Sequence, residues 1–368
     1  MIQLPLHEQL RINFMNLKRI LNIVIIPALF IPCTLIAYAN TYQISDYDMS
    51  VYSNSINNIY THPESHAASI DERLIFDSQQ FLGKPYYTPE SPLGDGKASE
   101  FDQNPLYRTD TFDCVTLVDT VIALAESNGL AQFEHNIIKI RYRNGGISYA
   151  NRDHWFSQVD WNKVNQANGF IKDITYKFVE EDGTPVAKVA KTNINKPNWY
   201  RHLLLANYSD PDMLGSIRII KPITLSTAEN LLSQLQQKSQ DVQQEKSILS
   251  YLPLSALFNS DESPNLFLFS QIPSGSVVEI VRPNWTVPSK KPYGTNLNVS
   301  HFGLAIRDSS GQLMFVEASS IYKKVVSIPL ISYLQGYIGS STIKGINVEK
   351  IVFPGAPEYR NKMLDRAG

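Results

Sequence analysis

The segment Arg108–Ala125 constrains the fold more than any other part of the chain. It reads RTDTFDCVTLVDTVIALA and passes from a polar loop into an almost wholly apolar stretch. Asp110, Thr111 and Asp113, which precede the stretch, are residue types that cap helix N-termini, and Gly129 is a residue type that ends helices. The apolar residues are Val115, Leu117, Val118, Val121, Ile122, Leu124 and Ala125. They cover a wide surface, so we expect a central, largely buried helix that starts near Asp113.

The remaining patterns place helices early and strands late, which is typical of an α+β fold. IDERLIFDSQQFLG predicts a helix that starts at Ile70 and stops at Gly83. IIKIRYRNGG and SIRIIKPITL are typical of strands. STAENLLSQLQQKSQDVQQEK, residues 226–246, predicts a helix that opens with a capping box from Ser226 to Glu229. The last third supplies the segments SGSVVEIVRPNW, VSHFGLAIRDSSGQLMFVEASS, KKVVSIPLISYLQGY and TIKGINVEKIVF, which predict strands, a hairpin and one helix.

The N-terminus has the layout of a secretory signal peptide. Lys18 and Arg19 precede an apolar run from residue 20 to 36, and Ala37-Tyr38-Ala39 follows as a cleavage site. We expect residues 1–39 to be the signal, with a true start at Met15, and a periplasmic or secreted protein. The alternative is an uncleaved membrane anchor. Residues 40–69 are expected to be a loosely ordered lead-in, 70–355 a single domain and 356–368 a tail.

Cleavage would leave Cys114 as the sole cysteine of an exported chain, because the other cysteine, Cys33, lies in the signal. Such a thiol cannot form an intramolecular disulfide, so it is buried or used. At the first turn of a helix, unpaired N–H groups and the macrodipole stabilise a thiolate. Cys114 is therefore a candidate nucleophile, and the alternative is a packed core cysteine.

A cysteine nucleophile needs a base, and His301 begins the apolar strand HFGLAIR, which can hold its ring rigidly. If the following hairpin has the five-residue loop 307–311, Glu317 lies directly across from His301 and orients it. A four-residue loop turns Glu317 to the other face. The alternatives are an edge-strand histidine and a surface glutamate without a role.

Other polar residues have weaker indications. His154 lies among aromatic and charged residues in NRDHWF and is a candidate ligand contact, and the Tyr86 hydroxyl could donate to an oxyanion. The net charge of −2 gives no reason to expect a nucleic acid partner. No histidine and cysteine cluster has the spacing of metal ligands. We expect neither a metal nor a cofactor.

The motifs LGKPY, FDCVTLVDTVIALA, HFGLAI and VEASS, in this order, resemble the NlpC-type branch of the papain-like cysteine hydrolases, which cut bacterial cell-wall peptides. NPLYRTDTFDCVT, IRYRNGGISYANRDHWF, GFIKDIT, VRPNW and STIKGIN resemble its N-acetylmuramoyl-L-alanine amidase-like subgroup. The resemblance implies a papain-like core, in which the nucleophile helix packs on a small antiparallel sheet. Residues 130–270 would then be a large insertion that elaborates the substrate groove.

Carried over by position, the resemblance implies Cys114 as nucleophile, His301 as base and Glu317 as orienting group. It implies a substrate-binding set of Tyr86, Asp113, Tyr149, Arg152, His154 and Ser319. The implied reaction is cleavage of the amide between N-acetylmuramic acid and L-alanine, on peptidoglycan fragments or muropeptides. We expect a monomer with no stable membrane insertion once the signal is cleaved. The alternatives are an endopeptidase within the stem peptide and a catalytically idle cell-wall-binding protein.

Overall fold

The computed structural model describes residues 48–86, 103–148, 151–205, 230, 232–233, 236–237, 242–286 and 294–352. All of them belong to the compact unit Gln43–Gly368. The expected signal peptide, the tail, the SIRIIKPITL strand, the Ser226 capping box and Tyr149 lie outside these residues. None of the helices in the described residues is long and apolar enough to cross a membrane.

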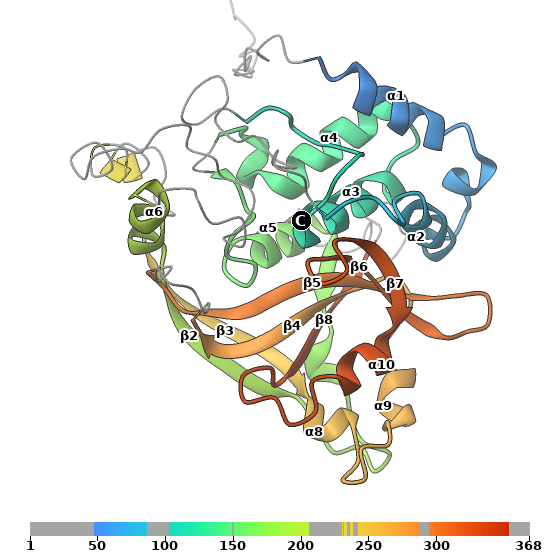
Figure 1. Cartoon of the computed structure of the whole chain (residues 1–368), viewed down its shortest axis with the longest axis vertical. Coiled ribbons are helices and arrows are strands. Elements are labelled where there is room, and N and C mark those ends of the chain that lie inside the picture. The colour runs from blue at the N-terminus through green and yellow to red at the C-terminus, as the bar shows by residue number, and fades with distance from the viewer. Residues whose placement is uncertain are drawn as a thin grey trace, which may run out of the picture. The chain divides into compact units, whose positions relative to one another are not determined.

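An antiparallel sheet forms the centre of the described structure (Figure 1). Its strands are β1 Ile171–Asp173, β2 Lys188–Asn195, β3 Gln244–Pro253, β4 Ser276–Trp285, β5 Leu297–Arg307, β6 Leu313–Ser319, β7 Lys324–Pro329 and β8 Gly345–Ile351. The order is β2-β3-β8-β4-β5-β6-β7, and β1 pairs with β8. The mixed architecture is consistent with the predicted α+β class. The sheet is larger than expected, because β1, β2 and β3 come from residues 130–270 and join it.

The helices gather on the sheet and at its ends. They are α1 Ser50–Ile59, α2 Ile70–Gln79, α3 Cys114–Ala125, α4 Leu130–Arg141, α5 Trp161–Asn168, α6 Lys196–Leu205, α8 Leu254–Leu257, α9 Leu266–Ser270 and α10 Leu330–Gln335. Short 3-10 turns occupy Pro63–His66, Arg143–Gly145 and Thr175–Lys177. Figure 1 shows α2, α3, α4 and α5 above the central strands, with α8, α9 and α10 below them.

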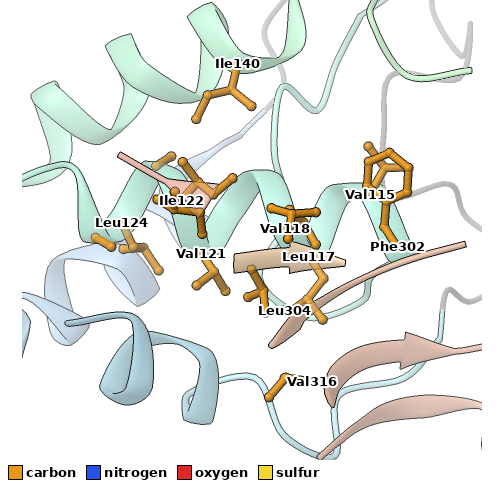
Figure 2. Packing of buried hydrophobic residues seen from close by; sticks show 14 of the residues in the cluster. Val115, Leu117, Val118, Val121, Ile122, Leu124, Ile140, Phe302, Leu304 and Val316 are labelled. Atoms are coloured by element: carbon orange, nitrogen blue, oxygen red, sulfur yellow. The ribbon is translucent and has the colours of Figure 1, made fainter. Parts of the chain in front are cut away.

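The central position of α3 is confirmed. Every residue of α3 from Val115 to Ala125 is buried, and the helix contacts α2, α4, β5 and β6. Figure 2 shows its side chains packed between Ile140 of α4 and the β-strand residues Phe302, Leu304 and Val316. Because the apolar residues of α3 point in almost every direction, the helix is stable only when covered on all these sides.

Two parts of the chain form helices where the sequence predicted otherwise. The expected loose lead-in contains α1, which buries Tyr52, Ile56 and Ile59, a stripe of residues spaced by four and three. The IIKIRYRNGG segment is not a strand, because its first half belongs to α4 and its second half contains the 3-10 turn Arg143–Gly145. The isoleucines favoured a strand, but Ile137 and Ile140 continue a buried helical stripe that starts earlier in α4.

The helix predicted after Ser226 ends earlier than the sequence suggested. Residues 230, 232–233 and 236–237 are helical, but the chain is extended from Gln244, where β3 begins. β3 pairs with β2 along eight positions and with β8 at Leu252 and Pro253. Sheet pairing therefore overrides the helical preference of the QQEK segment.

Two buried glutamates lie between the sheet and α5. Glu279 of β4 and Glu349 of β8 are fully buried, and Asn162 of α5 donates its Nδ2 hydrogens to both, over 3.1 and 3.3 Å. Burial raises the pKa of Glu279 to about 8 and that of Glu349 to about 10. Both carboxyl groups therefore hold a proton at pH 7 in the folded chain, which lets them share a dry interior without repulsion.

This protonation predicts how stability depends on pH. An unfolded glutamate loses its proton near pH 4.3, so above that value the folded state binds more protons. Stability therefore falls as pH rises from about 4.3, and it levels off above the folded pKa values of about 8 for Glu279 and about 10 for Glu349. We expect Glu349→Gln to reduce the loss of unfolding free energy between pH 6 and pH 9 by about 1–3 kcal/mol. Urea denaturation at both pH values measures it. The exposed Glu181→Gln is the control, and an unchanged pH dependence in Glu349→Gln would contradict the assignment.

Candidate active site

A capping box fixes the start of α3 and therefore the position of Cys114. Asp113 is the N-cap, and its Oδ1 accepts from the Thr116 backbone N–H over 2.8 Å. The Asp113 N–H in turn donates to Thr116 Oγ1 over 2.9 Å. Cys114 is thus the first helical residue, it is partly buried, and it is a free thiol. This arrangement leaves its sulfur at the positive end of the helix, where negative charge is stabilised.

His301 lies at an irregularity in the pairing of β4 and β5. Ile280 pairs with His301, but the next residue of β4, Val281, pairs with Val299, so Ser300 is an extra residue in β5. Such a bulge bends the strand locally and re-aims the side chains around it. His301 Nε2–H donates to the carboxylate of Glu317, and the side chain of His301 also hydrogen-bonds Cys114. Since Nε2 is engaged by Glu317, Nδ1 is the ring nitrogen that remains for Cys114.

The register of the hairpin differs from the one we expected. Arg307 pairs with Leu313, so the loop is 308–312 and not 307–311. Asp308 causes the shift, since its Oδ1 accepts from the N–H groups of Ser310 and Gln312. The direct pairing of His301 with Glu317 is therefore wrong. In the observed register, each residue of β5 pairs with a residue two positions further along β6 than expected. Because this is an even number, His301 and Glu317 stay on the same face of the sheet and meet as diagonal neighbours.

The electrostatics of His301 follow from these contacts. Burial lowers its pKa, but the hydrogen bond and charge of Cys114, followed by those of Glu317, outweigh burial and raise the pKa to about 10. Glu317 itself is buried, so its carboxylate is not the surface group that the alternative interpretation required. His301 is an imidazolium at neutral pH, held between two groups that favour its charge.

The dependence on Glu317 is testable. Glu317→Gln keeps the shape of the side chain but removes its negative charge, so we expect the pKa of His301 to fall by about one unit or more. Titration of the imidazole by NMR measures this shift. Glu72→Gln, on the exposed surface of α2, makes the same change in net charge and should leave the His301 titration in place. Equal titration curves for wild type and Glu317→Gln would contradict the assignment.

The predicted substrate-binding residues near the start of α3 are only partly brought together. His154 Nε2 lies 3.4 Å from Asp113 Oδ2, and burial lowers the pKa of His154 to about 4, so this ring is neutral. Tyr86 donates its backbone N–H to Lys323 and forms a bridge with Phe112, two residues before Cys114. Asp113, His154 and Tyr86 therefore lie around the helix start.

Other predicted residues have internal partners. Arg152 is buried and donates its Nε and Nη2 hydrogens to Gln103 Oε1, over 3.0 and 2.7 Å. Ser319 is buried too, and its hydroxyl accepts from the Tyr322 N–H in the turn after β6. These hydrogen bonds connect parts of the protein's own structure. Tyr149 lies outside the described residues.

The sequence did not single out Tyr333 of α10 or Phe315 of β6. The Phe315 ring lies 6.2 Å from the His301 ring and 4.6 Å from that of Tyr333, measured between centroids. Burial raises the pKa of Tyr333, and the electrostatic influence of Glu317, followed by that of Tyr337 and Cys114, adds to this effect. Tyr333 therefore belongs to the site's surroundings. The sequence carries no signal for this, because α10 approaches through packing and not through a spaced motif.

The capping box generates a stability prediction. Asp113→Ala removes the acceptor for the Thr116 N–H, so we expect a loss of about 1 kcal/mol in unfolding free energy. Asp113→Asn keeps an oxygen at the same place and should cost only a few tenths of that amount. Urea denaturation of the two variants measures the difference. The prediction fails if alanine and asparagine destabilise the protein equally.

No group of three or more histidine, cysteine, aspartate or glutamate side chains within the described residues is arranged to hold a metal ion. The side chains that the structure brings together around Cys114 are a thiol, an imidazole and a carboxylate in series.

Comparison with known proteins identifies the family to which the chain belongs. The sequence matches the model of the AmiA-like, N-acetylmuramoyl-L-alanine amidase-like family over residues 77–340. It is similar to a protein of known crystal structure from Legionella pneumophila str. Philadelphia 1, with 40% identity, a TM-score of 0.69, and coverage of 82% of this chain and 95% of that one. An N-acetylmuramoyl-L-alanine amidase from Bacteroides uniformis shares the fold at 22% identity and a TM-score of 0.50, covering 77% and 99%. Among curated protein sequences, none matches this chain.

Proposed function

The chain belongs to the N-acetylmuramoyl-L-alanine amidase-like family, and from this premise we propose that it is a cysteine amidase. Its substrate would be a peptidoglycan fragment or muropeptide, cut at the amide between N-acetylmuramic acid and L-alanine. The observation that carries the proposal is the series Cys114, His301 and Glu317, in which His301 contacts both other side chains. A nucleophile, a base and an orienting carboxylate in hydrogen-bond contact are what acyl transfer by a thiol requires.

The proposed reaction has two steps. The Cys114 thiolate attacks the lactyl carbonyl carbon, the C–N bond breaks, and the His301 imidazolium gives its proton to the departing amine of L-alanine. Water then attacks the thioester while neutral His301 takes one of its protons. The C–S bond breaks, which releases the muramic acid carboxyl group and restores the Cys114 thiolate and the His301 imidazolium, and the released carboxyl group gives its own proton to solvent. Glu317 holds the imidazole in place and stabilises its charge throughout.

The start of α3 would supply the remaining catalytic feature. Backbone N–H groups in the first turn of a helix have no partner within the helix, so they can donate to the oxyanion of the tetrahedral intermediate. The cap at Asp113 supports this role, since it holds the first turn in place beside Cys114. We accordingly propose a papain-like core of the NlpC type, with α3 as the nucleophile helix.

The cellular part of the proposal rests on the sequence. The charged, apolar and small-residue segments of positions 15–39 support export to the periplasm or beyond, with a retained anchor as the alternative. The substrate fits this location, because peptidoglycan lies outside the cytoplasmic membrane. We propose a monomer that acts without nucleic acid, metal or cofactor.

Replacement of Cys114 tests the proposed function. We expect Cys114→Ala to lower release of the stem peptide from defined muropeptides by about 10³-fold or more, because covalent catalysis is lost. Mass spectrometry of the products measures both the rate and the bond that is cut. Lys246→Gln, at an exposed position of β3, is a control that should retain full activity.

The same spectra separate the other possible activities. A lactyl sugar freed of its peptide supports the amidase, whereas a shortened stem that remains on the sugar would identify an endopeptidase. Wild-type protein that binds muropeptides and releases neither product would identify a cell-wall-binding protein. Full activity of Cys114→Ala would overturn the cysteine mechanism itself.

A further inference from the structure

Arg282 of β4, in the motif VRPNW, carries a charge that the described residues do not neutralise. Its side chain is partly buried, and the guanidinium carbon lies 4.6 Å from the centroid of the Trp285 ring. Its Nε is shielded from solvent and has no hydrogen-bond acceptor, and its electrostatic neighbours in the described residues are the hydroxyls of Tyr337 and Tyr333, with no carboxylate among them. A partly buried guanidinium without an acceptor is stabilised when a bound anion accepts its hydrogen bonds, so this side chain is suited to bind an anionic ligand.

Arg282 lies a short way along β4 from the residue that pairs with the proposed catalytic histidine. Ile280 lies directly across from His301 in the β4–β5 ladder, so the two side chains share one face of the sheet. Arg282 is two residues beyond Ile280, in the stretch between Val281 and Trp285 where the pairing is irregular. Its position therefore follows from its contacts and not from the alternation of the strand.

The contacts of Tyr333 in α10 also place Arg282 near His301. Tyr333 is close enough to interact electrostatically with Arg282 and also with Cys114 and Glu317. Its ring packs on Phe315, which packs in turn on His301. Arg282 and the hydroxyl of Tyr333 thus border the reacting groups. Because burial raises the pKa of Tyr333, this hydroxyl keeps its proton, and it also hydrogen-bonds Tyr337.

The chemistry of the substrate limits which anion this can be. In the bond proposed for cleavage, the lactyl carboxyl of the sugar is already consumed in the amide, so the free carboxylates belong to the stem peptide. The planar guanidinium matches a carboxylate with two parallel hydrogen bonds. We propose that Arg282 binds the α-carboxylate of the glutamate residue in the stem peptide and thereby selects stems that carry this acid over stems in which it is amidated. This inference rests on the proposed function, since it takes the muramoyl amide as the scissile bond.

Two substrates that differ in one group test the selection. N-acetylmuramoyl-L-alanyl-D-glutamate has a free α-carboxylate, whereas N-acetylmuramoyl-L-alanyl-D-isoglutamine has an amide in its place. We expect wild type to prefer the acid by about 10- to 100-fold in kcat/KM, the range of one charged hydrogen-bonded pair. Arg282→Gln should bring the ratio close to one, and Arg282→Lys should retain part of the preference because the charge remains. Lys246→Gln removes one positive charge from the exposed surface and should keep the wild-type ratio.

The outcomes separate this inference from the proposed function. A wild-type ratio near one, or a preference that survives in Arg282→Gln, overturns the role of Arg282 even if the muramoyl amide is cut. Calorimetric binding of the two compounds to Cys114→Ala tests the role without any turnover, and tighter binding of the acid that disappears in Cys114→Ala/Arg282→Gln supports it. If wild type instead cuts a different bond, the proposed function fails, while the binding comparison still decides whether Arg282 recognises the carboxylate. Melting temperatures of the Arg282 variants show whether the protein remains folded.

Discussion

The burial of α3 is the constraint on which the rest of the structure depends. A helix that is apolar in almost every direction cannot rest at the surface, so α2, α4 and the strands β5 and β6 must all pack on it. The polar side chain of Asp119, buried in this helix, accepts from Arg141 Nε over 3.0 Å and from Trp161 Nε1 over 2.8 Å. Asp119 thus ties α4 and α5 to α3. Once these contacts fix the helix, the position of its first residue, Cys114, is fixed as well.

The same burial explains how residues far apart in the sequence meet. The face of α3 that packs on Phe302 and Leu304 aligns the helix with β5, and the strand carries His301 next to Phe302. The extra residue Ser300 interrupts the regular β4–β5 ladder next to His301. In a regular strand, the direction of the imidazole would be set by the alternation of side chains alone. The geometry of the candidate active site therefore depends on one helix cap and one strand irregularity, both supported by the packed core between them.

The sequence predicted those features that depend on local chemistry and failed where tertiary contacts decide. Capping residues and apolarity were sufficient to locate α3, and strand patterns located the late hairpin. The isoleucines of α4 suggested a strand because isoleucine favours strands, although their spacing also fits a buried helical stripe. In α1, the three buried residues are too few to stand out as a stripe in the sequence alone. The contact of His301 with Glu317 was predicted through a wrong register. The contact exists because the hydrogen bonds of Asp308 place the loop at 308–312, which shifts the strand pairing by an even number of residues. Both side chains therefore remain on the same face of the sheet.

Charges in the interior follow one rule over most of the described structure. Asp119 is matched by Arg141, Asp160 by Arg143 and Lys196, and the glutamates beneath α5 remain neutral because burial favours their protonated form. His301 obeys the rule too, since two groups that favour its charge flank it. Folding alone requires such compensation, because an unmatched buried charge is costly. Arg282, near the proposed catalytic groups, is the exception, because no carboxylate of the described residues neutralises it. Such an unmatched charge is expected where a bound ligand supplies the opposite charge.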